Sequence, residues 1–263
     1  MDITTFNVNS LRAREERFKL WLEARHPSVL CLQETKVRDE EFPVGIFEER
    51  GYSVIYHGQP TYNGVAIAVA SGLSVSDPVI GLPPAVEPDQ CRFLSLQVEG
   101  IRVVNVYVPN GGEVDGPRYA YKLEWLRRLK EHLTAQHSAS EPLVVCGDFN
   151  VALDDRDVFD PEAHRGQILC SDPERARMAE LMSFGLVDLH RKFTQEGGIY
   201  TWWDYRNLGF QKNRGFRIDL FLATSTLADR CLSVEIDRAE RKGTKPSDHA
   251  PVRATFAEGS TGR

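Results

Sequence analysis

Residues 92–108 read RFLSLQVEGIRVVNVYV, and this stretch decides between two architectures. It holds two apolar strand-like runs, residues 92–98 and 101–108, separated only by Glu99 and Gly100. A connection of two residues predicts a tight β-hairpin with antiparallel strands. An eight-fold βα barrel would need a crossover helix between consecutive strands. The hairpin therefore favours a mixed sheet with antiparallel pairs over such a barrel.

On both sides of the hairpin, the apolar pattern alternates between helical and strand-like periods. Helices are expected where apolar residues recur on one stripe, at residues 11–25, 39–50, 118–137 and 173–184. Further strands are expected at residues 3–6, 29–32, 52–56, 65–70 and 143–146, and the chain after residue 184 has the pattern of strand and loop up to Phe256. Strands that pair locally in both halves, with helices between them, indicate two stacked mixed sheets flanked by helices.

The composition is that of one globular unit. The chain has 263 residues, a length that two-sheet folds commonly reach with a single core. No repeat, low-complexity linker or change of composition divides it, so residues 1–258 are expected to form one domain and residues 259–263 a flexible tail. The net charge of −6 argues against non-specific coating of nucleic acid, but it leaves room for a local basic face.

The cysteines and the start of the chain predict a soluble, cytoplasmic protein. The cysteines are odd in number and lack close spacing, which is typical of buried, reduced thiols: Cys31, Cys91, Cys146, Cys170 and Cys231. No basic segment followed by an apolar one begins the chain, so no signal peptide is expected. The longest strongly apolar stretch, residues 65–70, is far shorter than a membrane span.

Polar residues that can hold a hard metal ion or move a proton stand at the ends of the apolar runs. They are Asn7, Glu34, Tyr107, the pair Asp148 and Asn150, Asp219, and the pair Asp248 and His249. If the strands lie side by side, their ends meet at one rim of a sheet and these scattered residues form a single site. An enzyme is the leading interpretation of this pattern.

Taken one at a time, these residues also have ordinary structural explanations. Glu34 could cap a helix or lie at the surface. Asp148 and Asn150 are two residues apart and point to the same side of an extended segment, but an Asx turn at a strand end has the same pattern. A lone histidine is more often structural, and His249 is distinguished by its place at a strand end, with Asp219 as an orienting partner.

The chemistry of these ligands favours a hard cation. Oxygen ligands predominate, and the sequence has neither a Cys/His cluster at zinc spacing nor a His-Glu-x-x-His motif. This favours Mg²⁺, with Mn²⁺ as a substitute, over zinc. Because magnesium shares its coordination with substrate phosphate, hydrolysis at phosphorus is the expected reaction.

Eight segments resemble the successive signatures of the exonuclease III family of AP endonucleases, in the bacterial-type branch of the endonuclease/exonuclease/phosphatase superfamily. They occur in the family's order: FNVNSLRA (6–13), LQETK (32–36), YNGVAI (62–67), YVPNG (107–111), GDFNV (147–151), YTWWDYR (200–206), RID (217–219) and SDHAP (247–251). Any one of these motifs is weak, but all of them in order are highly specific.

The resemblance implies a four-layer α/β sandwich, with two mixed β-sheets packed face to face and flanked by helices. It also implies a Mg²⁺-dependent nuclease of base excision repair, which hydrolyses the phosphodiester 5′ to an abasic (AP) site and leaves a 3′-hydroxyl and a 5′-deoxyribose phosphate. Some 3′-to-5′ exonuclease and 3′-phosphatase activity is implied as well. The expected partner is double-stranded DNA with abasic sites or blocked 3′ ends, bound by a monomer that is associated with the nucleoid in a prokaryote.

Matching positions imply a role for each residue at the strand ends. The residues expected at or near the metal are Glu34 as the principal ligand, Asn7 and Asp248. The expected catalytic set is Asp148, Asn150, His249, Tyr107 and Asp219. Within it, Asp219 would orient His249, and Asp148 is the candidate base that activates water. The alternative of His249 as the base stays open, as does the choice between one and two metal ions.

Substrate choice is expected to depend on a basic and aromatic segment. Residues 205–217 contain four cations and no acidic residue, as contact with a phosphate backbone requires: Arg206, Lys212, Arg214 and Arg217. By matching position, Trp202 and Phe216 would line a pocket that accepts a base-free sugar and excludes a nucleotide with its base. A solvated loop is the alternative for the cations.

Two other functions are compatible with the same scaffold. A phosphoinositide phosphatase or sphingomyelinase of the superfamily would share the metal site, but it has no evident need for the basic and aromatic segment. A non-catalytic binding module is disfavoured because every expected catalytic position is filled. The balance of endonuclease to exonuclease activity is not readable, since residues 165–168 do not match the family pattern clearly.

Overall fold

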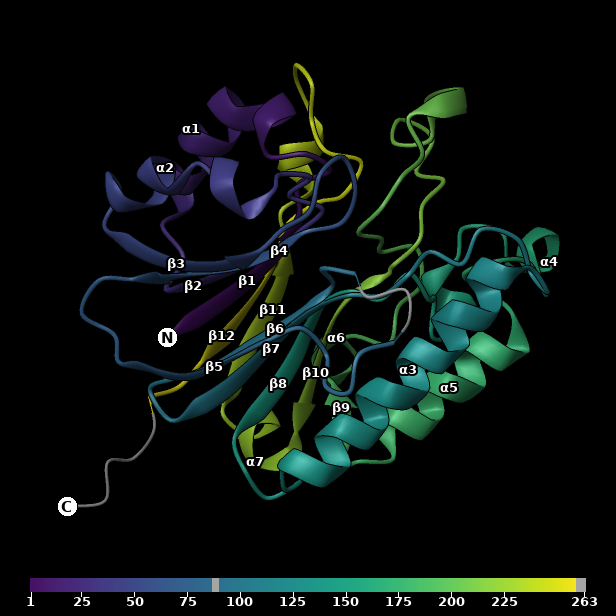
Figure 1. Cartoon of the computed structure of the whole chain (residues 1–263). Helices are drawn as coiled ribbons and strands as arrows, with labels where there is room; N and C mark the ends of the chain where they lie inside the picture. Colours follow the sequence, from purple (N-terminus) through teal and green to yellow (C-terminus); the bar gives the residue numbers. More distant parts are fainter. Residues whose placement is uncertain (87–89, 259–263) are drawn as a thin grey trace.

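Two mixed β-sheets face each other in the computed structural model, which describes residues 1–86 and 90–258 (Figure 1). Within the described residues, the first sheet has the order β11 (Cys231–Ile236), β12 (Val252–Phe256), β1 (Asp2–Asn7), β2 (Val29–Gln33), β4 (Val65–Ala70) and β3 (Tyr52–His57). The second has the order β5 (Val75–Ile80), β6 (Phe93–Val98), β7 (Ile101–Tyr107), β8 (Leu143–Asp148), β10 (Asp219–Thr224) and β9 (Leu186–Asp188). In each sheet the central pair, β1 with β2 and β7 with β8, is parallel, and the other pairs are antiparallel.

Helices cover the outer face of each sheet, so that the four-layer α/β sandwich is confirmed. Figure 1 shows α1 (Glu15–Arg25) and α2 (Val44–Glu48) over the first sheet, and α3 (Pro117–Gln136) and α5 (Asp172–Met182) over the second. The shorter helices among the described residues are α4 (Pro161–His164), α6 (Leu189–Phe193) and α7 (Ser225–Ala228). Single 3₁₀ turns lie at Arg12–Arg14, Asp39–Glu41, Asp155–Asp157, Arg206–Leu208 and Arg238–Arg241.

Three apolar clusters separate the four layers, because each strand of a buried sheet alternates its side chains between two faces. The cluster between the sheets includes Ile67, Val103 and Phe221. The cluster beneath α3 and α5 includes Val104 and Leu126, and a third lies between the first sheet and helices α1 and α2. The strands at the centre of each sheet are thus buried on both faces and hold their ends in place.

The hairpin that decided the architecture is confirmed. Val98 of β6 pairs with Ile101 of β7, and the two residues between them have positive φ angles, 48° for Glu99 and 76° for Gly100. Two consecutive left-handed residues match the right-handed twist of the flanking strands.

Three expectations about secondary structure were wrong. The chain after residue 184 was expected to hold only strands and loops, but it contains the short helices α6 and α7. The helix predicted at residues 39–50 is split into a 3₁₀ turn and the short helix α2, because Pro43 disfavours helical backbone at Phe42, whose ψ is 128°. Strand β5 was not predicted, because its exposed sequence VSDPVI contains a proline and a register shift between Ser76 and Val79.

Three further predictions concern the cysteines, a membrane span and the tail. All five cysteines are buried. Among the described residues, no helix combines the length and the apolar character needed to cross a membrane. The expected flexible tail, residues 259–263, lies outside the described residues.

Candidate active site

The polar residues predicted from the strand ends meet at one rim, where the two sheets face each other. Asn7 ends β1, and its register partner Gln33 is followed by Glu34. In the second sheet, Asp148 ends β8 and pairs with Tyr107 on one side and with Asp219 on the other. His249 joins them from the segment that precedes β12, which is antiparallel to β1. Both sheets therefore contribute to the site.

One amide connects the two carboxylates nearest the rim. The Nδ2 of Asn7 donates to Oε1 of Glu34 and to Oδ2 of Asp148, each at 2.9 Å. Asn7 and Asp148 are buried, whereas the Glu34 side chain is 17% exposed and so faces the opening of the site. The backbone of Glu34 has φ of 51°, in the left-handed region that non-glycine residues rarely adopt. Such strain is typical of positions that the surrounding structure holds for a function.

A second set of buried side-chain contacts joins His249 to two carboxylates. The Nδ1–H of His249 donates to Oδ2 of Asp219 at 2.9 Å, and its Nε2 lies 3.7 Å from Oδ2 of Asp148. Ser247 holds the loop in place, because its hydroxyl donates to the backbone oxygen of Asn7 and accepts from the backbone N–H of His249. The imidazole is thus held between two acidic groups with one nitrogen facing each.

Burial and charge shift the proton affinities of this group. Burial raises the pKa of Asp148 to about 7. The positive charge of His249 lowers this pKa, but the negative charges of Asp219 and Glu34 oppose that effect. For His249, burial lowers the pKa, but the charges of Asp219 and Asp148 outweigh it and raise the pKa to about 10. At neutral pH the imidazole therefore carries a proton, and Asp148 is the group that can gain or lose one.

The amide of Asn150 lies against the same carboxylate. Its backbone N–H donates to Oδ1 of Asp148 at 2.9 Å, and its Nδ2 donates to Oδ2 at 3.3 Å and to the backbone oxygen of Val108 at 3.0 Å. The first of these contacts is an Asx turn, so the alternative considered for this motif is also present. The turn gives Asn150 a φ of 50° and keeps its side chain beside Asp148.

Tyr107 also lies close to Glu34. Burial raises the pKa of Tyr107 well above its usual range, and the charge of Glu34 raises it further, so the phenol stays protonated and can donate a hydrogen bond. The guanidinium of Arg92 lies 4.6 Å from the centre of the Tyr107 ring and donates to the Tyr107 backbone oxygen at 3.2 Å. These contacts hold the ring in place.

Two carboxylates in the site, with His249 beside them, could hold a cation. One ligand atom each from Glu34, Asp148 and His249 lies within 4.8 Å of the others. Asp248 is adjacent, but both of its carboxylate oxygens accept side-chain hydrogen bonds, from Asn9 and from the Nε1–H of Trp202, each at 2.9 Å. Carboxylate oxygens fit a hard divalent ion, whose charge would offset the burial and the repulsion that raise the pKa of Asp148.

An aromatic wall stands beside this group. The ring centres of Trp202 and Phe216 are 5.6 Å apart, and both residues bridge between extended segments. His164, which ends α4, packs edge-on against Phe216 at 5.0 Å, and Phe159 does so at 5.8 Å. Residues 165–168, whose sequence gave no clear match, follow this wall directly, and Ile168 packs against the same apolar cluster.

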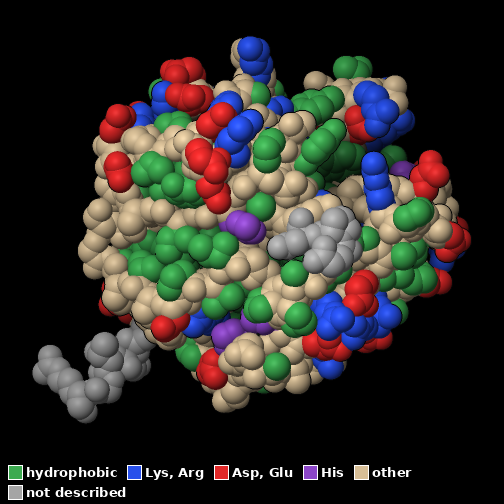
Figure 2. All heavy atoms as spheres, in the orientation of Figure 1, with side chains coloured by type: hydrophobic (Ala, Val, Ile, Leu, Met, Phe, Trp, Pro, Cys, Tyr) green, Lys and Arg blue, Asp and Glu red, His purple; other side chains and the backbone are tan. Residues whose placement is uncertain are grey.

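Of the four predicted cations, three are exposed. Arg206, Lys212 and Arg214 lie on the segment that projects at the upper right of Figure 1, and Lys and Arg side chains are visible there in Figure 2. Arg206 is paired with Asp204, the residue directly before the predicted strip, at 2.8 Å. Lys212 and Arg214 have no ion-pair partner within residues 1–86 and 90–258, which leaves their charges available for an anionic ligand.

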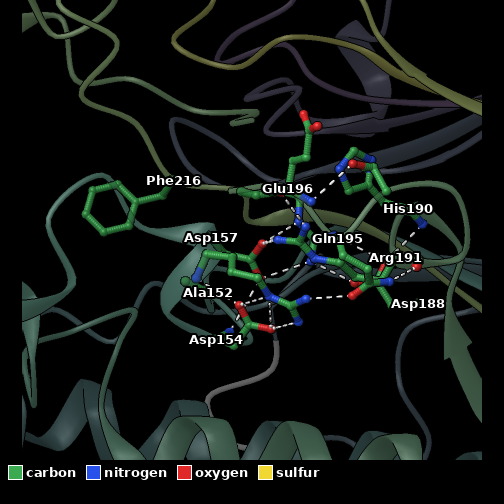
Figure 3. A network of polar contacts seen from close by, with 12 residues as sticks. Ala152, Asp154, Asp157, Asp188, His190, Arg191, Gln195, Glu196 and Phe216 are labelled. Atoms are coloured by element: carbon green, nitrogen blue, oxygen red, sulfur yellow. Dashed lines mark hydrogen bonds and ion pairs between the residues drawn. The ribbon is translucent and has the colours of Figure 1, made fainter. Parts of the chain in front are cut away.

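The prediction that Arg217 contacts DNA was wrong, because its side chain is only 1% exposed. Its guanidinium donates to both oxygens of Asp157 and both of Asp188, at 2.7 to 3.2 Å. Figure 3 shows Asp157, Asp188 and Arg191 within this network, with the Phe216 ring pointing away from it. Arg217 therefore stabilises the segment that carries Phe216, and spacing alone could not separate this role from phosphate contact.

Several residues at the site were not singled out from the sequence. The ammonium of Lys36 lies 2.8 Å from Oε2 of Glu34 and donates to Oδ1 of Asn9 at 2.6 Å. The Nδ2 of Asn110 donates to Oδ1 of Asn150 at 3.1 Å. All three of these residues, Lys36, Asn9 and Asn110, stand inside motifs that carried the family resemblance, and this was the signal that could have identified them.

Comparisons with known proteins agree with this geometry. The model of the endonuclease/exonuclease/phosphatase family matches residues 4–249. Exodeoxyribonuclease III of Haemophilus influenzae is 36% identical over 271 residues, which cover 97% of this chain and 100% of that protein. The structure of the 3′ phosphatase NExo from Neisseria, bound to a product DNA hairpin, has a TM-score of 0.93 at 39% identity and covers 98% of this chain and 100% of its own. An AP endonuclease from Archaeoglobus fulgidus has a TM-score of 0.92 at 39% identity, with 97% and 99% covered.

Proposed function

Since the chain belongs to the endonuclease/exonuclease/phosphatase family and is a hydrolase of the exodeoxyribonuclease III type, we propose that it is a magnesium-dependent DNA repair nuclease that cleaves 5′ to abasic sites. The observation that carries the proposal is the group of Asn7, Glu34, Asp148, Asp219 and His249, which is buried except at Glu34 and lies beside an aromatic wall. Exposed cations lie on the segment between the two aromatic residues of that wall, Trp202 and Phe216. Because the residues of this group span most of the chain, residues 1–258 act as one catalytic domain.

The residues that would hold the metal are Glu34, as the principal ligand, with Asn7 and Asp248 close by. A hard divalent ion, Mg²⁺ or Mn²⁺, would supply positive charge to a phosphate oxygen and favour ionised Asp148. The contact of Lys36 with Glu34, at 2.8 Å, orients this carboxylate. The chemistry of the proposed ligands supports magnesium, because Glu34, Asn7 and Asp248 would all bind the ion through oxygen atoms.

Asp148 is the better of the two candidates for the base. Burial raises the pKa of Asp148 above its usual range, so this carboxylate accepts a proton more readily than an exposed aspartate does. Burial lowers the pKa of His249, but the charges of Asp219 and Asp148 outweigh it and favour the protonated imidazole, which serves as a donor. Asn150 orients Asp148 through two hydrogen bonds and can position the attacking water beside it.

Three donors would stabilise the charge that grows on the phosphate oxygens as water attacks. They are the phenol of Tyr107, the amide of Asn150 and the imidazolium of His249. Asp219 orients His249 and keeps it charged. Donors that are already fixed before the reaction contribute most to such stabilisation, because they need little reorganisation.

The aromatic wall and the free cations support a DNA substrate. Trp202 and Phe216 form an apolar surface that suits a sugar without its base, and Lys212 and Arg214 can contact the DNA backbone. One structural relative is a 3′ phosphatase bound to DNA product, which supports action on blocked 3′ ends as well. We propose that a monomer acts on this DNA in the cytoplasm, which in a prokaryote means at the nucleoid.

A single assay tests the proposed function. Purified protein is mixed with an end-labelled duplex that contains one synthetic abasic site, in Mg²⁺ or in chelator, beside an intact duplex and a duplex with a 3′-phosphate. Incision at the abasic site and removal of the 3′-phosphate are expected, both only with the ion and both leaving a 3′-hydroxyl, with no incision within the intact duplex. Equal cutting of the intact duplex would contradict abasic-site specificity, and hydrolysis of phosphoinositide vesicles without DNA cleavage would favour the lipid phosphatase alternative.

A further inference from the structure

A buried ion pair lies directly beneath the loops of the site. Lys122 of α3 and Glu174 of α5 form it, and both side chains are 0% exposed. Burial lowers the pKa of Lys122, although the charge of Glu174 opposes this shift. A buried ion pair is seldom needed for stability, because an apolar pair of similar volume is often as stable or more so. The presence of this pair therefore calls for another explanation.

The ammonium of Lys122 contacts three acceptors on three different segments. Besides the carboxylate of Glu174, it donates to the backbone oxygen of Asn150 at 2.6 Å and to that of Asn110 at 3.1 Å. An ammonium has three protons, so each can serve one of these acceptors. Because the group is fully buried, it cannot reach a DNA phosphate from this position.

The two carbonyl groups belong to the loops whose amides face the site. Asn110 lies in the loop after β7, and Asn150 follows β8. The side chains of these residues are joined at 3.1 Å, and the Nδ2 of Asn150 also contacts Asp148. A rotation of either peptide unit would therefore move the donor that is proposed to contact the scissile phosphate.

Glu174 is itself held rigidly, so that it fixes the position of the ammonium. Its Oε1 accepts from the backbone N–H of Leu169, and its Oε2 accepts from the backbone N–H and the hydroxyl of Ser171. The Ser171 hydroxyl lies 2.6 Å from the Tyr119 hydroxyl, which belongs to the same helix as Lys122. These hydrogen bonds thus join helices α3 and α5 beneath the loops that carry Asn110 and Asn150.

We propose that Lys122 is a positioning residue, whose ammonium sets the rate of hydrolysis by holding the carbonyl groups of Asn110 and Asn150 at the same time. This inference rests on the proposed function. It goes further because it assigns a kinetic role to a residue that contacts neither substrate nor metal.

The test uses the double variant Lys122→Met/Glu174→Gln, which replaces the ion pair with neutral side chains of similar size. Single-turnover cleavage of abasic duplex in Mg²⁺ is measured together with the dissociation constant for the same duplex in chelator and with the melting temperature. The rate is expected to fall about 100-fold, since small displacements of positioning groups have effects of this size. The dissociation constant is expected to stay within about threefold, because no DNA contact is removed.

The matched control is Arg127→Met/Glu131→Gln, which removes an exposed ion pair from the same helix α3 and should leave all three measurements unchanged. If the Lys122 double variant does not fold, Lys122→Gln/Glu174→Gln takes its place, because a glutamine amide lacks the ammonium's third donor. A wild-type rate in a folded variant, or weaker DNA binding with an unchanged rate, would overturn the inference. Failure of the wild-type protein to cleave abasic DNA would instead contradict the proposed function.

Discussion

The imidazole of His249 donates to Asp219 at 2.9 Å, and both side chains are buried. Asp219 begins β10 in the second sheet, whereas His249 precedes β12 in the first. The contact therefore crosses between the sheets and depends on their packing. It also gives His249 the largest of the charges that raise its pKa.

We expect Asp219→Asn to lower the single-turnover rate by about 100-fold, within the range known for general acid–base groups. Loss of the Asp219 charge also lowers the pKa of His249 from its value of about 10, so the alkaline limb of the pH–rate profile should move to lower pH. Asp229→Asn, at an exposed position, is the control. An unchanged alkaline limb would argue against a charged His249 in the reaction.

Glu34→Gln should weaken the binding of divalent ions. A ligand that binds only the folded protein raises the melting temperature, so Mg²⁺ or Mn²⁺ should stabilise the wild type and have much less effect on the variant. Calorimetric titration with each ion gives the affinity directly. Glu162→Gln, whose carboxylate is 82% exposed, should behave like the wild type. Equal ion binding by both variants would exclude Glu34 as the principal ligand.

Lys212→Met and Arg214→Met should each reduce the salt dependence of DNA binding. Each phosphate contact releases about one counterion, so the slope of log Kd against log salt concentration should decrease by about 1 per variant. Arg177→Met, on helix α5 and paired with Glu180, serves as the control. Binding measured from low to moderate salt decides the matter, and unchanged slopes would support the solvated-loop alternative.

Arg217→Met should act on stability and not on DNA contact. The substitution leaves the buried carboxylates of Asp157 and Asp188 without their main partner, which typically costs about 3 to 5 kcal/mol in the free energy of unfolding. Urea denaturation measures this loss. Arg206→Met removes an exposed guanidinium and should leave the unfolding free energy unchanged.

Protonation of His190 should contribute to acid unfolding. Burial lowers the pKa of His190 to about 4, the nearby charge of Arg217 lowers it further, and neither ring nitrogen has a hydrogen-bond partner among the described residues. The unfolded chain gains its proton near pH 6.5, before the folded protein does, so stability is full above that pH and falls as the pH drops toward 4. The difference in unfolding free energy between wild type and His190→Leu should therefore change by up to about 3 kcal/mol across this window. A constant difference would contradict the shift.

Much of the site could be predicted because strand ends are local features of the sequence. Apolar runs locate the central strands, and the residues that follow them, such as Glu34 and Asp148, must then lie at a rim. The hairpin at Glu99 and Gly100 has its own turn signal, so the mixed character of the sheet was also readable. The packing of two sheets against each other completes the site.

The features that were missed depend on contacts distant in sequence. Arg217 resembles a DNA-binding cation in spacing, and only the fold brings Asp157 and Asp188 to it. In the sequence, Lys122 looks like any polar residue of an amphipathic helix. Its backbone acceptors lie in the loops after β7 and β8, and only the fold brings them to it. Strand β5 is short of apolar residues, since its side chains are mostly exposed.

The strand order of the first sheet has a consequence for fragments of this protein. Strand β1 is the first strand described and its antiparallel neighbour β12 is the last, so the two pair across nearly the whole described sequence. A fragment that ends after β10 contains Glu34, Asp148 and Asp219, yet it lacks His249. The chemistry proposed for the site therefore depends on the pairing of β12 with β1, and a fragment without β12 and the segment before it would lack the proton donor.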